Sequence, residues 1–203
     1  MLSMHRKSKR RSIASTITIL LSIFILITGL YLLSLALSPM VVPLIAHTEI
    51  DTKTLADPEP KRQQIIIPKI GVMVDYAPGE SALDKGAQWR RPENGNPVRG
   101  GNFIIAAHRL SIQPTPQATI EKSPFYNIDK LAIGDTILVD YVGKRYSYTI
   151  QKIFNVKPEQ VEIEDESVDP ILTLYSCDLT GAATGRVVII AEPTNRSTYP
   201  EIN

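Results

Sequence analysis

Residues 136–156 read TILVDYVGKRYSYTIQKIFNV, two runs rich in β-branched and aromatic residues with a short glycine-containing connection between them. The first run covers Thr136–Tyr141, the second covers Arg145–Val156, and residues 142–144 separate them. β-Branched and aromatic residues favour strands, and a short connection containing glycine favours a tight turn between antiparallel neighbours. This stretch therefore predicts a β-hairpin, and it indicates a mostly β domain.

Similar runs recur on both sides of this hairpin, separated by Gly, Pro, Asn and Asp. Helical patterning is confined to Ser81–Trp89, with Ser81 as a candidate N-cap, and to one or two turns within Pro124–Leu131. Many short strands predict an antiparallel sandwich or a small closed barrel, and we prefer the barrel because closure removes exposed strand edges. The other predicted strands are Ile65–Val74, Asn102–Ala107, Ile171–Cys177 and Arg186–Ala191.

An uncharged apolar run extends from Ile13 to Leu37, directly after a cluster of basic residues. As a helix this run would be about 37 Å long, enough to cross a hydrocarbon layer of ~30 Å. It lacks the polar stripe of a core helix. A cleaved signal peptide is the alternative, with small residues at Ala36 and Ser38, but its apolar part is usually only ~7–15 residues long. We expect an uncleaved anchor with its basic end in the cytoplasm and the residues after Leu37 outside.

The chain is thus expected to hold one folded domain behind a membrane anchor. The segment after Ala46 is polar, with several Asp, Pro, Lys and Arg residues, which is typical of a tether. No second membrane span is expected after Ala191. The net charge of +1 gives no support for a nucleic-acid-binding surface. The predicted segments are a cytoplasmic basic stub (1–12), a transmembrane helix (13–37), an extracytoplasmic linker (38–64) and the folded β domain (65–203).

Cys177 is the only cysteine of the chain, and it lies where an apolar strand gives way to a polar loop. Without a second cysteine it is either a small buried hydrophobe or a thiol kept for chemistry. A thiolate is a nucleophile, and a nearby cation favours that form. Arg186 opens the next strand, so its guanidinium is a candidate for stabilising an oxyanion or holding a substrate backbone. An exposed arginine at a strand edge is the alternative.

Three histidines are available as a partner for the thiol. His5 lies in the basic stub and His47 lies in the linker, which leaves His108 at the end of the strand Asn102–Ala107. A histidine there is a candidate acid and base that protonates the leaving amine after a thiolate attacks a carbonyl. Taken alone, a loop histidine without a chemical role is the more common situation.

Four stretches of the chain together resemble one family, the sortases, which are membrane-anchored cysteine transpeptidases. The resemblance extends from the anchor to the last strand, and the order and spacing of the stretches agree with the family. Two positions depart from its usual pattern, with Ala107 in place of a glycine and Ser176 in place of a threonine. The stretches are Ile67–Gly71 (IPKIG), Gly79–Gly86, Gly101–Arg109 (GNFIIAAHR), and Thr173–Cys177 (TLYSC) with Arg186–Val188 following it.

The resemblance implies a closed eight-stranded β-barrel with one or two short helices, and Cys177, His108 and Arg186 as the catalytic residues. It also implies a reaction in which Cys177 cleaves the C-terminal sorting signal of a surface protein and forms a thioacyl enzyme. An amine acceptor of the cell envelope, such as a cell-wall precursor, then takes the acyl group. No cofactor is required by this chemistry.

Three other functions compete with this one. A hydrolytic peptidase would use the same site with water in place of the amine, and a non-catalytic anchored β domain would only bind a partner. Cell-wall transpeptidases that act on D-amino acids are disfavoured, because they carry a glycine where this chain has Ser176.

Asp57 and Pro58 match the start of the lid motif of pilin-polymerising sortases but lack its aromatic residue, which favours an anchoring role.

An acidic stretch precedes the strand that carries Cys177. It is a candidate for binding a calcium ion that orders a substrate loop, although a solvated acidic loop is the more common alternative. Substrate recognition is expected in the loops around Ile112–Ser123 and Lys157–Pro170. The acidic residues are Glu162, Glu164, Asp165, Glu166 and Asp169, of which the first three are the candidate ligands.

Overall fold

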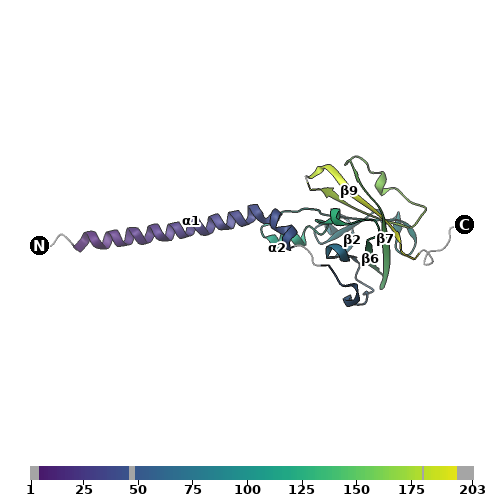
Figure 1. The fold of residues 1–203 in the computed structure, drawn as a ribbon, viewed down its shortest axis with the longest axis horizontal. Coiled ribbons are helices and arrows are strands. Elements are labelled where there is room, and N and C mark those ends of the chain that lie inside the picture. The colour runs from purple at the N-terminus through teal and green to yellow at the C-terminus, as the bar shows by residue number, and fades with distance from the viewer. Residues whose placement is uncertain (1–4, 46–48, 180, 196–203) are drawn as a thin grey trace.

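The computed structural model describes residues 5–45, 49–179 and 181–195, and it consists of one long helix followed by a β-rich unit (Figure 1). The helix α1 (His5–Ile45) contains a stretch, Ser15–Leu37, that is long and apolar enough to cross a membrane. This agrees with the predicted span, and α1 continues beyond it at both ends. His47 and both ends of the chain lie outside the described residues.

The strands form a closed barrel. In spatial order they run β3-β2-β1-β6-β7-β9-β8-β5, and β3 also pairs with β5 to complete the ring. The prediction of a closed eight-stranded β-barrel is confirmed. The short β4 pairs with the first two residues of β5, ahead of the part of β5 that pairs with β3. The strands are β1 (Gln64–Ile67), β2 (Val72–Pro78), β3 (Ala87–Arg90), β4 (Gly95–Asn96), β5 (Gly100–Ala107), β6 (Thr136–Tyr141), β7 (Lys144–Val156), β8 (Ile171–Asp178) and β9 (Gly181–Pro193).

The hairpin predicted from residues 136–156 is present as β6 and β7. Tyr141 pairs with Lys144, so the turn contains only Val142 and Gly143. Both turn residues have positive φ, 49° and 73° respectively. Positive φ at both central positions gives the turn the twist that two antiparallel strands require, and a glycine adopts it without strain.

The segment Ile65–Val74, predicted as one strand, is two strands. Residues Pro68–Ile70 form a 3-10 turn (η2) that ends at Gly71 with a φ of 63°. Proline has no N–H to donate to a ladder, and glycine adopts the left-handed conformation that reverses the chain. The halves before and after this turn pair with each other as the antiparallel strands β1 and β2.

The helix predicted over Ser81–Trp89 is wrong. A short 3-10 turn, η3 (Glu80–Ala82), is followed by strand β3. At Gly86 a Cβ would lie 2.3 Å from the Asp75 carbonyl oxygen, so β2 approaches too closely for any residue but glycine there. The ring of Trp89 then packs edge to face against Tyr76, Phe103 and Tyr141, and this aromatic cluster favours the strand.

The short helices lie in the connections between strands. The turns predicted within Pro124–Leu131 are present and include η4 (Ile128–Lys130). The helix α2 (Pro116–Glu121) lies in a segment that we expect to be a loop. Its sequence carries the signals of a helix start, since Thr115 caps the N–H of Ala118 and a proline occupies the first turn. The remaining 3-10 turns are η1 (Thr52–Thr54) and η5 (Glu162–Glu164).

Two strand pairs differ from the predicted antiparallel arrangement. Strands β2 and β3 are parallel, and so are β5 and β8. In the second pair Asn102 lies opposite Ile171 and Ala106 lies opposite Tyr175. Parallel neighbours finish at the same edge of a sheet. The carboxyl ends of β5 and β8 therefore lie side by side.

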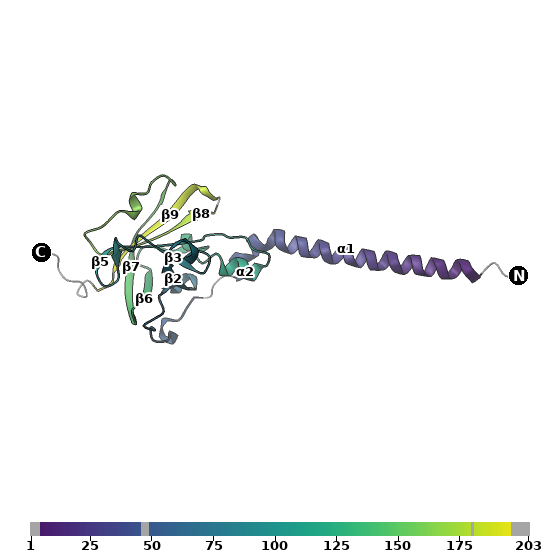
Figure 2. The ribbon, with the colours of Figure 1, turned by 180° about the vertical axis from the view of Figure 1, so that it is seen from behind.

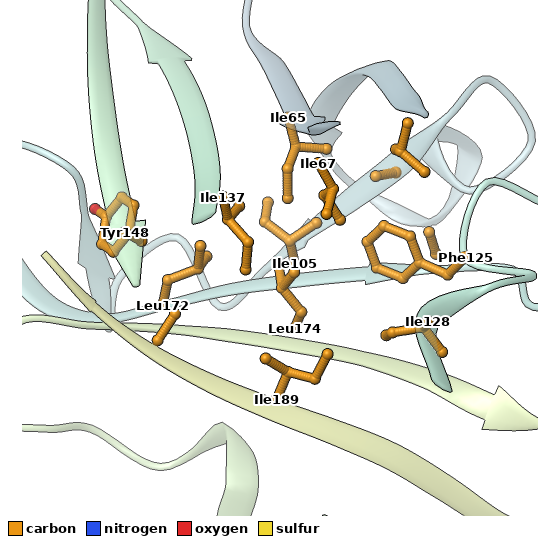
Figure 3. Packing of buried hydrophobic residues seen from close by; sticks show 14 of the residues in the cluster. Ile65, Ile67, Ile105, Phe125, Ile128, Ile137, Tyr148, Leu172, Leu174 and Ile189 are labelled. Carbon is orange, nitrogen blue, oxygen red and sulfur yellow. The ribbon is translucent and has the colours of Figure 1, made fainter. Parts of the chain in front are cut away.

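Alternate residues of the strands fill the barrel interior (Figure 3). A second, smaller apolar cluster covers the outer face of β5, β8 and β9 beneath the connection between β7 and β8. The labelled interior residues are Ile65, Ile67, Ile105, Phe125, Ile128, Ile137, Tyr148, Leu172, Leu174 and Ile189. The buried outer residues are Ile104, Ala106, Val156, Tyr175 and Val188.

The described part of the predicted linker lies against the barrel. The N–H of Ile50 donates to the Pro68 carbonyl at 3.0 Å, and the Arg145 guanidinium donates to the Ala56 carbonyl at 3.0 Å. Arg145 lies at the start of β7, whereas Val156 at its other end pairs with Arg186. The Asp57-Pro58 segment next to Ala56 therefore lies at the end of β7 opposite to Arg186.

Candidate active site

Cys177 and Arg186 lie directly opposite each other on β8 and β9. Opposed residues of an antiparallel pair project from the same face of the sheet. That face is the outer one, because Tyr175 and Val188, two residues away on each strand, belong to the outer apolar cluster. Both Cys177 and Arg186 are half-buried, so the thiol and the guanidinium share a partly shielded surface.

His108 follows the last residue of β5, beside the same strand end. The hydroxyl of Ser176 donates to the Ala107 carbonyl at 2.8 Å, which continues the parallel register of β5 and β8 by one residue. One residue further, the same register sets His108 beside Cys177. The structure thus brings the three predicted residues together where β5 and β8 end beside the middle part of β9.

The pairing of β8 with β9 is irregular beside the thiol. Cys177 pairs with Arg186, whereas the next residue, Asp178, pairs with Gly181. Such irregularities bend a strand and change the direction of a side chain, and they are frequent next to active sites. The thiol therefore lies at the last regular position of β8.

Arg109, the residue that follows His108, is buried, which the sequence does not predict. It is only 5% exposed and forms an ion pair of 3.1 Å with Asp129 of η4. The Phe125 N–H also donates to the His108 carbonyl at 3.1 Å. A buried charge needs a partner, so this pair holds the segment that follows β5 in place. No pattern in the sequence distinguishes Arg109 from a surface arginine.

Arg186 is held by two neighbours rather than exposed at a strand edge. Its Nη1 donates to the Pro158 carbonyl at 2.8 Å, and its Cζ lies over the Tyr175 ring, 5.6 Å from the ring centre. A guanidinium above an aromatic face is attracted by the negative charge of that face. The cation therefore rests on the outer face next to Cys177.

Glu164 fixes the β7–β8 connection, which we name the acidic loop (residues 157–170), to the barrel. Its carboxylate accepts two hydrogen bonds from Arg90 at 2.8 and 3.2 Å, one from Arg91 at 3.3 Å, and one from the Tyr175 hydroxyl. Burial alone would raise the pKa of Glu164, but the hydrogen bonds from Arg90 and Tyr175 lower this pKa below its ordinary value. The carboxylate thus stays ionised at neutral pH.

Asn102 forms a second clamp on the acidic loop. Its side-chain amide donates to the carbonyls of Ile163 at 3.2 Å and Asp165 at 2.7 Å, and it accepts from the Thr173 hydroxyl at 2.6 Å. These bonds join the loop to β5 and β8, the two strands whose ends lie beside His108 and Cys177. The acidic loop is therefore ordered by the barrel itself.

The comparisons with known proteins identify the family of the fold. A family model described as the Sortase domain matches residues 65–194. The chain belongs to the sortase family. A search of curated proteins found no match.

Several solved sortases have the same fold as this sortase. The chain is similar to the Sortase D5 transpeptidase of Clostridium perfringens, with 25% identity and a TM-score of 0.54 over 66% of this chain and 79% of that one. It is similar in fold to sortase A of Listeria monocytogenes (22% identity, TM-score 0.54, 68% and 89% covered). Sortase C-1 of Actinomyces oris also shares the fold (19% identity, TM-score 0.56, 82% and 99% covered). These relatives come from three sortase classes, so they support the family rather than one class.

The predicted calcium ligands have different settings in this sortase. The Glu164 carboxylate already accepts hydrogen bonds from two arginines, whereas Glu162 and Asp165 are exposed. Across residues 5–45, 49–179 and 181–195, no group of three or more His, Cys, Asp or Glu side chains is arranged to hold a metal ion. Calcium binding by the acidic loop stays a prediction.

Replacing Glu164 with glutamine should make the free energy of unfolding less sensitive to low pH. The folded-state pKa of Glu164 is lowered, so its ionised form adds stability above the unfolded value of about 4.3, and this stability is lost as pH falls through the folded value. We expect Glu164→Gln to cost ~1–3 kcal/mol at pH 7. Between about pH 5 and 3 the variant should lose less stability than the wild type.

Thermal unfolding across this pH range measures the effect of Glu164→Gln. Glu162→Gln is the matched control, because Glu162 belongs to the same 3-10 turn and is exposed. Equal acid sensitivity of the wild type and Glu164→Gln would contradict the assigned ion pairs.

Replacing Ser176 with alanine should loosen the strand ends at the site. Ser176 is buried, and its hydroxyl joins β8 to the last residue of β5. Loss of this bond should lower the free energy of unfolding by about 1 kcal/mol. Because the bond spaces the strands that carry His108 and Cys177, kcat/KM should fall by roughly tenfold. Ser176→Thr keeps the hydroxyl and is the control. An alanine variant as active as the threonine variant would show that the bond has no part in the site.

Proposed function

We propose that this sortase is a cysteine transpeptidase that uses Cys177 as nucleophile, His108 as acid and base, and Arg186 as the group that stabilises negative charge. The observation that carries the proposal is the pairing of Cys177 with Arg186 on an outer face that ends beside His108. A nucleophile, a proton carrier and a fixed cation are the groups that acyl transfer requires. The site belongs to rigid strand ends, which favours their alignment.

In the first half of the proposed reaction, the Cys177 thiolate attacks the carbonyl carbon of the scissile peptide bond. The carbonyl oxygen gains negative charge, and the Arg186 guanidinium donates hydrogen bonds to this oxygen or to the adjacent substrate backbone. The bond from carbon to nitrogen breaks as His108 gives a proton to the leaving amine. The products are a thioester on Cys177 and a shortened peptide.

In the second half, an amine of the cell envelope attacks the thioester carbon. His108 takes a proton from this amine, the bond from carbon to sulfur breaks, and the thiolate leaves. A new amide forms and Cys177 returns to its starting state. The thioester divides one difficult amide exchange into two easier steps. Water in place of the amine would give hydrolysis.

The proposed substrates are C-terminal sorting signals of surface proteins, and the acceptor is a cell-wall precursor or another envelope amine. The loop Ile112–Ser123, which contains α2, and the acidic loop flank the site and are proposed to recognise the signal. An anchoring role is preferred to pilin assembly, because the Asp57-Pro58 segment lies near Arg145 at the far end of β7.

The anchor is proposed to hold the active site close to the membrane, with the N-terminus in the cytoplasm. Helix α1 contacts α2, in the segment that follows His108, and it leaves the barrel on that side (Figures 1 and 2). A tether raises the effective concentration of substrates held in the same membrane. The catalytic end of the barrel would then face surface proteins that are still anchored by their own sorting signals.

The proposal is tested with the full-length protein in detergent micelles, incubated with a pool of sorting-signal peptides. Intact-mass spectrometry should show an acyl adduct on Cys177 that hydroxylamine removes, together with the cleaved peptide. Added amines should increase product formation if the enzyme is a transpeptidase, and should leave it unchanged if it is a hydrolase. An unmodified protein across all peptides and amines would favour the anchored binding domain.

We expect the proposed activity to be independent of calcium. The acidic loop is held by Arg90 and Arg91 on Glu164 and by the Asn102 amide, so its order needs no added cation. Turnover in EDTA and in millimolar calcium should agree within about twofold, since the Glu164 charge is already compensated. A large calcium activation, lost in Glu162→Gln but not in Glu93→Gln, would instead support the predicted calcium site.

A further inference from the structure

We propose that Tyr175 is a positioning residue that orients Arg186 by offering the face of its ring to the guanidinium. This inference rests on the proposed function, since it assigns a task to a residue that acts through Arg186. Tyr175 lies on the same face of β8 as Cys177, and its partner Val188 lies on the same face of β9 as Arg186. The Tyr175 ring therefore lies on the same face as both groups, one step along the strands from their pairing.

The contact between the two side chains is a cation–π contact in a shielded place. Arg186 Cζ lies 5.6 Å from the centre of the Tyr175 ring, and Tyr175 is only 8% exposed. Such contacts strengthen as water is removed from them. The ring can thus hold the guanidinium in one orientation, at a position where a long arginine side chain would otherwise sample many rotamers.

The Tyr175 ring is itself held in place through its hydroxyl group. Its hydroxyl donates to Glu164, and Glu164 is held by Arg90 and Arg91 at the end of β3. Burial and the hydrogen bond to Glu164 raise the pKa of Tyr175, so the phenol keeps its proton and remains a donor at physiological pH. A continuous set of contacts therefore runs from β3 through Glu164 and Tyr175 to Arg186.

The face of an aromatic ring is suited to orienting Arg186 because it does not occupy the N–H donors of the guanidinium. A guanidinium has five N–H groups in its plane, and a carboxylate partner would occupy two of them and cancel the charge. The Tyr175 ring attracts the cation through its face, and the Pro158 carbonyl uses only Nη1. The remaining in-plane donors stay available for a developing oxyanion or a substrate carbonyl.

A double-mutant cycle in the full-length protein tests the proposal. Tyr175→Phe keeps the ring but loses the hydroxyl bond to Glu164, so its kcat/KM should fall only about threefold. Tyr175→Leu removes the ring and should lower kcat/KM roughly tenfold, within the range of a shielded cation–π contact. In an Arg186→Ala background the same leucine change should cause no further loss, because Tyr175 acts through the guanidinium. Equal losses in both backgrounds would overturn the proposal.

A second readout does not depend on activity. Above an aromatic face, protons are shifted upfield, so the Nε–H and δ-methylene signals of Arg186 should be upfield in arginine-labelled wild-type protein and in Tyr175→Phe. The Arg186→Ala variant assigns these signals. Ordinary shifts in the wild type would overturn the proposal even if Tyr175→Leu fails to fold.

The two readouts separate the failure of this inference from the failure of the proposed function. An inert wild type with upfield Arg186 signals would reject the transpeptidase and keep the contact between Tyr175 and Arg186. An active wild type with additive losses in the cycle would keep the transpeptidase and reject the positioning role.

Discussion

Alanine in place of Cys177 is expected to abolish the proposed acyl transfer, with turnover falling by at least about 10³-fold to the detection limit. The chain has one cysteine, so no second thiol can replace it. In the proposed mechanism no thioester forms without the thiolate, so His108 and Arg186 have no covalent intermediate on which to act. The measurement is the rate of peptide cleavage, together with the intact mass of the protein after incubation with substrate.

Folding and binding controls distinguish a lost nucleophile from a lost structure. Cys177 is only half-buried at the end of β8, so the alanine variant should unfold within a few degrees of the wild type. It should also still bind the sorting-signal peptide, because the loops on either side of the site are unchanged. Wild-type turnover by Cys177→Ala would reject the cysteine mechanism.

Local signals predict much of the barrel, and nonlocal pairings explain what they miss. The hairpin of residues 136–156 is visible in sequence because both strands and their turn are contiguous. The Pro68–Gly71 reversal and the Thr115 cap of α2 also carry local signals, which the β-rich pattern around them obscures. By contrast, the parallel pairing of β5 with β8 joins distant segments, and alternation of residues cannot reveal it.

The same difference between local signals and nonlocal contacts applies to the candidate active site. Cys177, His108 and Arg186 could be proposed from the sequence because each lies at the end or start of a predicted apolar strand and has a distinctive chemistry, and their catalytic roles stay a proposal. Their supports could not be proposed in this way, since the hydrogen bond from Arg90 to Glu164 joins residues 74 positions apart and that from Ser176 to Ala107 joins residues 69 apart. A charged residue in an acidic loop resembles a solvated one until the fold brings its partners to it.

The structure also gives the acidic loop a role that its composition does not suggest. Its sequence predicts a metal-binding or solvated segment, yet the loop bonds to arginine, asparagine and tyrosine side chains through the Glu164 carboxylate and the backbone carbonyls of residues 163–165. Pro158 of the same loop accepts a hydrogen bond from Arg186. Loop order and the position of the cation are therefore physically linked, and substitutions at Glu164 should affect both.

The second large effect is expected at His108, where alanine should lower kcat by about 10²–10⁴-fold. The His108 side chain is half-buried beside the end of β8. The backbone carbonyl of His108 accepts a hydrogen bond from the Phe125 N–H, which fixes the backbone from which the imidazole reaches the leaving amine. Without a proton from His108, the amine is a poor leaving group because it must depart unprotonated. Single-turnover acylation of Cys177, followed by intact-mass spectrometry, measures the step directly.

Chemical rescue separates proton transfer by His108 from a structural role. Imidazole in the buffer should restore part of the acylation rate of His108→Ala, because the vacated site can accept a free proton carrier. His108→Gln keeps a polar side chain of similar length but cannot carry the proton, so it should be as slow as the alanine variant and should not respond to imidazole. Full activity in His108→Gln would show that the residue only shapes the site, and the proton carrier would then have to be another group where β5 and β8 end beside β9.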